Sequence, residues 1–212
     1  MTNLDLLLES FRRNARVTEF LLNSMSDEDL TFSDGKGGMT VAHMLSHMGT
    51  SRGGWLADMS PEYAASTKAL TDGKFIWEWQ TTDRGAIKAM FKAGDEAAIQ
   101  AVQAHLASGQ PFADPRNMGT YQSNPAHFLL QNIVHDSHHR GQIIALLRQN
   151  GYSTEQLDKL EEHCDPTRPS IAYLPSIHGM NSVTSACPHG PLFAHPMNLK
   201  PRDFDLRVPS AL

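Results

Sequence analysis

Four segments of this chain carry apolar residues every three or four positions, and this helical period constrains the fold more than any other feature of the sequence. The segments cover about residues 3–24, 40–58, 83–108 and 124–150. No segment alternates apolar and polar residues in the way that a half-buried strand does. The pattern therefore predicts an all-α protein, a four-helix bundle with one long crossover between its second and third helices.

Local signals predict where these helices begin and end. Thr40 is a good N-cap for the second helix, and Gly151 is a typical stop for the fourth. Asn124 is expected to cap the fourth helix, with Pro125 at its first helical position. Because proline and glycine interrupt residues 60–81, we expect an irregular crossover there with a short helical piece.

The last part of the chain differs in composition from the rest. A fifth, short helix is expected at about residues 153–163, and beyond it residues 165–212 hold eight of the twelve prolines and show no apolar period. The sequence therefore predicts a helical domain over residues 1–164 and a Pro-rich C-terminal extension over 165–212, irregular or draped over the body or a partner. The extension contains four residues of types that can bind metal, but their spacing matches no known ligand set: His178, Cys187, His189 and His195.

Charge and hydropathy exclude several classes of function. The net charge is −5 and no basic stripe is present, which argues against binding to nucleic acid. No apolar run is long enough to span a membrane, and the N-terminal residues do not form a signal peptide. The two cysteines show no pairing pattern, so we expect a reduced, cytoplasmic protein.

The fourth helix contains the stretch "NIVHDSHHRGQIIALLRQNG", residues 132–151, with three histidines in five positions. A helix turns by about 100° per residue, so His135 and His139 lie within about 40° of each other, on the stripe that carries the core residues. His138 points instead toward the polar side, beside His127 and Gln131. An inward pair four residues apart is the spacing of helical metal sites, although two buried histidines with hydrogen-bond partners would give the same pattern.

The second helix offers a third ligand. His47 lies at the edge of its apolar stripe, whereas His43 is turned about 40° further toward the polar side. His105, near the end of the third helix, is expected to have no role in a metal site. Three neutral imidazoles leave a divalent ion with an open position, as in catalytic sites. Such an ion would lower the pKa of bound water or hold a thiol as thiolate. The stretch is not HExxH, so metalloprotease chemistry is not supported.

These motifs resemble those of the DinB-like superfamily. "HDSHHRGQIIALLRQNG" is similar to its fourth-helix signature, HxxxHRGQ followed by an LLRxxG-type ending, and "VAHMLSHM" to its second-helix signature. The resemblance covers about residues 1–151 and implies an up-down-down-up bundle with a metal held by His47, His135 and His139. In the matching "RGQ", it suggests that Gly141 allows close helix approach and that Arg140 and Gln142 support bundle or homodimer contacts.

The resemblance also indicates a function. Relatives include thiol-dependent enzymes, such as bacillithiol S-transferases and mycothiol-dependent isomerases. We therefore expect a divalent ion, zinc or nickel, that activates a low-molecular-weight thiol or water for transfer to small electrophiles, with a role in stress response. The sequence identifies no catalytic residue. Two alternatives stay open: a metal-dependent hydrolase, for which Asp136 is the only nearby proton acceptor, and a non-catalytic metal-binding stress protein.

Overall fold

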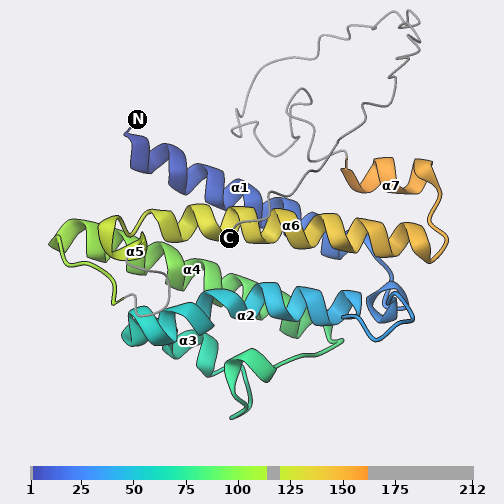
Figure 1. Cartoon of the computed structure of the whole chain (residues 1–212), viewed down its shortest axis with the longest axis horizontal. Helices are drawn as coiled ribbons and strands as arrows, with labels where there is room; N and C mark the ends of the chain where they lie inside the picture. Colours follow the sequence, from blue (N-terminus) through green and yellow to red (C-terminus); the bar gives the residue numbers. More distant parts are fainter. Residues whose placement is uncertain (1, 114–119, 162–212) are drawn as a thin grey trace, which may run out of the picture. The chain divides into compact units, whose positions relative to one another are not determined.

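The computed structural model describes residues 2–113 and 120–161, and within them the chain is all-α, with no strand. Four long helices lie side by side and contact one another (Figure 1). Their bounds are α1 Asn3–Ser24, α2 Val41–Met59, α4 Arg84–Ser108 and α6 His127–Gln149. The expected domain boundary at residue 164 and the Pro-rich extension lie outside the described residues.

Short helices connect the long ones. They are η1 (Asp29–Thr31), η2 (Pro61–Ala64), α3 (Ala65–Lys68), η3 (Ile76–Glu78), α5 (Thr120–Ser123) and α7 (Thr154–Glu161). The crossover between α2 and α4 therefore contains three short helical pieces, where the sequence predicts one. Pro61 begins the first piece, and Gly73, at φ 78°, lies in the turn between the second and the third.

Polar side chains cap the starts of three long helices. Thr2, Thr40 and Asp83 each accept a hydrogen bond from a backbone N–H of the first turn of their helix. The predicted start of α6 is wrong by two residues. The Asn124 side chain accepts from the Ala126 N–H, and its carbonyl accepts from the His127 N–H, so residues 124–126 form a turn that precedes the helix.

The apolar core consists of two clusters, one toward each end of the long helices. One cluster combines the C-terminal halves of α1 and α6 with the N-terminal halves of α2 and α4, and its members include Leu21, Leu22, Val41, Leu45, Ile87, Ile143 and Leu147. The other combines the opposite halves, and its members include Leu8, Phe11, Leu56, Ala98, Val102, Phe128 and Leu129. The middle part of each long helix therefore lies between the two clusters, and polar side chains enter the interior there.

Glycines allow α2 to be approached closely from two sides. A Cβ at Gly94 of α4 would lie 3.2 Å from the carbonyl oxygen of Gly49 and from two side-chain carbons of Arg52. On another side, a Cβ at Gly54 would lie only 2.3 Å from the indole of Trp77. The absence of side chains therefore lets α4 and the crossover pack directly against the α2 backbone.

Candidate metal centre

The structure brings His47 of α2 together with His135 and His139 of α6. One ring nitrogen from each of the three lies within 4.8 Å of the others, and all three residues are half-buried. The closest pair is His47 Nε2 and His135 Nε2, at 3.1 Å. Ring centroids are 5.0 Å apart for His47 with either partner and 4.5 Å apart for the pair on α6. The helix directions inferred from the sequence account for this convergence.

A neighbouring side chain orients one of the two α6 histidines, and a carboxylate lies near the other. His139 Nδ1 lies 2.7 Å from Gln142 Oε1. Because an amide oxygen only accepts, Nδ1 carries the proton and Nε2 keeps its lone pair for a ligand. His135 Nδ1 is buried, lies 3.8 Å from Asp136 Oδ1 and has no hydrogen-bond partner among the described residues. Metal-binding histidines usually have a carboxylate or a carbonyl oxygen near the ring nitrogen that does not bind the metal.

The environment favours neutral imidazoles, which is the form that binds metal. Burial lowers the pKa of His47 to about 4, and the charges of His135, His139 and His43 act in the same direction. Burial also lowers the pKa of His139, again with a contribution from His135. At neutral pH these nitrogens therefore present lone pairs rather than protons.

The donor set fits a divalent ion. Two nitrogens bound at about 2 Å to a tetrahedral ion must lie about 3.3 Å apart, close to the 3.1 Å between His47 and His135. Imidazole is a ligand suited to zinc, nickel and copper. The described residues contribute three donors to the group, and an ion held by these three alone would keep a fourth position for a small molecule.

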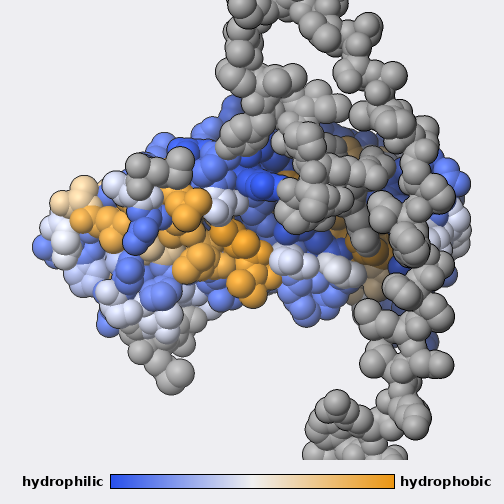
Figure 2. Space-filling model, turned by 90° about the horizontal axis from the view of Figure 1, so that it is seen from above, coloured by the Kyte–Doolittle hydropathy of each residue, from blue (hydrophilic) through white to orange (hydrophobic). Residues whose placement is uncertain are grey.

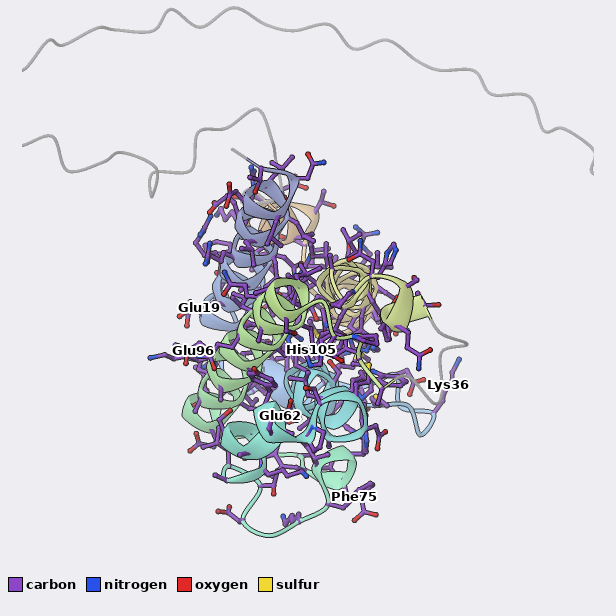
Figure 3. All side chains as sticks on the ribbon, turned by 90° about the vertical axis from the view of Figure 1, so that its left-hand side faces the viewer. Glu19, Lys36, Glu62, Phe75, Glu96 and His105 are labelled. Carbon is purple, nitrogen blue, oxygen red and sulfur yellow. The ribbon has the colours of Figure 1, made fainter. Side chains whose placement is uncertain are left out.

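Other histidines do not join this group. His43 is half-buried one turn before His47, and the exposed His138 only stacks edge-on against His139. Both ring nitrogens of His105 have partners on other segments, Ser60 Oγ and the Gln110 carbonyl, each at 2.8 Å, so its role is structural. Figure 3 labels His105 among the side chains of the fold. The histidines of the Pro-rich extension lie outside the residues that the structure describes.

A tryptophan that sequence reasoning missed lies beside the histidines. The half-buried ring of Trp77, from η3, is 6.4 Å from His47 and meets Trp55 edge-on at 5.8 Å. Its indole rests on α2 where Gly54 leaves room. The adjacent glycines in "GGW" were the available signal, since two glycines inside a helix indicate close backbone approach. The crossover thus supplies an aromatic wall next to the group.

Asp136 does not face the histidines as a free base. Its fully buried carboxylate receives two hydrogen bonds from Arg52, at 2.6 and 2.9 Å, and one from Asn14 at 2.6 Å. Burial raises its pKa, but the Arg52 charge and the hydrogen bonds from Arg52 and Asn14 together outweigh burial and lower the pKa to about 2. Asp136 is therefore ionised and committed to an ion pair. This pairing could not be predicted from the sequence, because Arg52 lies 84 residues away from Asp136.

The "RGQ" residues have roles that differ from those expected in one respect. Arg140 donates to Asn14 and Thr18 on α1, and Gln142 orients His139, so both support contacts within the fold. Gly141 is exposed, and a Cβ there would meet nothing within 4 Å. The expectation that Gly141 allows close helix approach is therefore wrong for the helices of residues 2–113 and 120–161, because none of them comes within 4 Å of a Cβ at this position.

A comparison with known protein families supports the resemblance that the sequence motifs indicate. The model of the DinB family matches residues 1–168. No curated protein and no solved structure is similar enough to this chain to add a relative. Among the residues described, no helix has the length and apolar character needed to cross a membrane.

Proposed function

Because this chain belongs to the DinB family, we propose that His47, His135 and His139 hold a divalent metal ion at which a low-molecular-weight thiol is activated for transfer to small electrophiles. Zinc or nickel suits three imidazoles. The observation that carries the proposal is the convergence of one nitrogen from each of three half-buried histidines, a set that no fourth His, Cys, Asp or Glu of the described residues joins.

The residues around the group would bind and orient the reactants. A bound divalent ion would supply Lewis acidity, lowering the pKa of a thiol at its open position. Gln142 keeps His139 in the tautomer that offers Nε2, and Asp136 lies behind His135. Trp77, beside His47, offers an apolar surface for the body of a substrate and limits the access of water.

The first alternative, a metal-dependent hydrolase, is less favoured by the structure. Hydrolysis requires a group that accepts a proton from water near the ion. Asp136 was the only candidate, and its carboxylate is fully buried against Arg52 with its oxygens already hydrogen-bonded. A thiol has a lower pKa than water, so thiol activation needs less help from a protein base.

Turnover with thiols tests the proposal. The protein loaded with Zn²⁺ or Ni²⁺ is mixed with glutathione, bacillithiol or mycothiol and a fluorogenic electrophile, and adduct formation is followed. We expect a rate above that of the metal-free protein and above that of His47→Ala. Ester or amide turnover without a thiol would favour the hydrolase. Tight metal binding without either reaction would favour the third reading, a non-catalytic metal-binding stress protein.

We also propose that the four long helices form a four-helix bundle with up-down-down-up topology. Each core cluster combines like ends of α1 and α6 with the opposite ends of α2 and α4. This mixing supports an up-down-down-up order with the long crossover between α2 and α4. It also explains why histidines near the middle of α2 and of α6 can meet.

We also propose that the chain forms a homodimer through the exposed side of α6. Leu130 and Val134 are 46% and 63% exposed there, and Gly141 is open on the same helix. Apolar side chains gather on the face shown in Figure 2. An exposed apolar area with a glycine is suited to close contact with a second helix.

A further inference from the structure

A network of buried polar groups crosses the middle of the fold, between the two apolar clusters. Arg52 of α2 is fully buried, and its guanidinium donates to Asp95 of α4 at 2.8 Å and to both oxygens of Asp136 of α6. Asn14 of α1 donates to Asp136 and accepts from Arg140 of α6 at 2.8 Å. The network therefore joins all four long helices.

Along α6, a residue of the buried polar network directly follows each of the two converging histidines. His135 is followed directly by Asp136, and His139 by Arg140. Neighbouring residues on a helix differ in direction by about 100°, so each histidine that faces His47 is followed by a residue anchored in the interior. Arg52, which binds Asp136, is five residues beyond His47 on α2. The same two helices thus carry both the ligand group and its nearest anchor.

Stability alone does not account for this arrangement. Replacing a buried ion pair by apolar side chains of similar volume is often neutral or stabilising. Geometry, in contrast, is demanding: a rotation of α6 by about 10° would move an atom about 6 Å from its axis by about 1 Å. A metal site tolerates a displacement of its ligand atoms of only about 0.5 Å. Arg52 meets Asp136 with two hydrogen bonds, and this fork fixes both rotation and register.

We propose that the Arg52–Asp136 ion pair is a positioning device for the histidine group, which sets α6 against α2 so that His135 and His139 meet His47. The inference rests on the proposed metal site. Two features of the structure accommodate Arg52: Gly94 leaves space for its side chain, and the Phe91 ring lies 5.1 Å from its guanidinium, within the range of a cation–π contact. Lysine, with a single charged nitrogen, cannot reproduce the fork.

The experiment measures Co²⁺ affinity by competition with a chelator, together with the absorption spectrum of bound Co²⁺, which reports the geometry of the ligands. Arg52→Lys keeps the charge and loses the fork. The triple variant Arg52→Met, Asp95→Asn, Asp136→Leu removes the charges and keeps most of the buried volume. We expect both variants to bind Co²⁺ about 10–100-fold more weakly than the wild type and to show an altered spectrum. Substitution of the groups that orient metal ligands in other proteins has an effect of this size.

Two controls separate positioning from stability. Arg84→Lys alters another arginine, which pairs with Asp27 and bonds backbone near the end of α1, away from the histidines. Val102→Ala removes buried volume from the core cluster near the end of α4. Both should lower the melting temperature and leave Co²⁺ affinity and spectrum unchanged.

The outcomes are distinct. Affinity within threefold of wild type in folded Arg52→Lys and the folded triple variant would overturn the positioning role while leaving the metal site intact. Loss of folding in both variants would also overturn it, because the network would then be needed for the fold itself. A wild-type protein that binds no Co²⁺ would overturn the proposed metal site, and the positioning role with it.

Discussion

At the scale of single residues, three histidines from α2 and α6 converge, and Trp77 and the Arg52–Asp136 ion pair lie beside them. The spacing of His135 and His139 on an apolar stripe is a local property that the sequence records. Arg52 could not be identified as buried, because its carboxylate partners lie 43 and 84 residues away and no periodic pattern marks them. Trp77 approaches His47 from a crossover with no regular period.

The low pKa of His47 predicts how the stability of the metal-free protein depends on pH. The folded protein keeps this imidazole neutral down to about pH 4, whereas the unfolded chain takes up the proton below about 6.5. Because the unfolded state binds more protons in this window, the free energy of unfolding should fall as the pH drops from about 6.5 to about 4. Urea unfolding of the apo protein at several pH values measures this slope. His47→Gln should have a shallower slope; parallel slopes would contradict the assignment.

The position of Trp77 predicts an optical signal for metal binding. Its ring lies 6.4 Å from that of His47, and quenching of indole fluorescence by Ni²⁺ acts over short distances. Titration of the apo protein with Ni²⁺ should therefore quench fluorescence, and Trp77→Phe should lose most of the change. Trp79→Phe, which removes a buried tryptophan two residues away, is the matched control. Full quenching in Trp77→Phe would mean that the ion binds elsewhere.

At the scale of helices and connections, periodicity predicted the four long helices closely but not how the crossover packs. Long amphipathic helices can be recognised in a sequence because apolar residues recur on the buried side at every turn. The crossover is held instead by single contacts, such as Trp77 against Gly54, which have no period. The start of α6 was misplaced for a related reason: Asn124 forms a turn before the helix rather than its cap.

Two glycine substitutions test this packing. Gly54→Ala places a Cβ 2.3 Å from the Trp77 ring, so the ring and the crossover must shift, and we expect a destabilisation of about 1–3 kcal/mol. Gly141→Ala adds a methyl to an exposed helix position where nothing lies within 4 Å, and should stabilise a monomeric chain by about 0.5–1 kcal/mol. Chemical denaturation measures both. A neutral Gly54→Ala would show that the crossover is not seated on α2.

At the scale of the whole molecule, the three-histidine group lies between two apolar clusters, beside the ion-pair network that joins the four long helices. Family membership and the all-α fold agree with what the sequence predicts. Substrate, metal and assembly depend on groups outside the chain, and for this reason no pattern within it determines them.

The proposed homodimer gives a prediction at this scale. Val134→Glu puts a charge on the exposed apolar side of α6 and should convert a dimer to a monomer, because burying an unpaired carboxylate is costly. Sedimentation velocity measures the change. Leu106→Glu, at another exposed apolar position on α4, should leave the dimer intact. A wild-type protein that sediments as a monomer at all concentrations would contradict the proposal.

The central claim is that three particular histidines bind one metal ion, and metal content per chain tests it most directly. Single alanine variants of His47, His135, His139, His43 and His138 are purified, checked for folding by circular dichroism, loaded with Zn²⁺ and analysed for metal. The first three should lose most of the ion, because each removes one of the converging nitrogens. His43→Ala and His138→Ala should keep nearly one ion per chain. Retention of metal by folded His47→Ala or His139→Ala, or its loss from His138→Ala, would contradict the account.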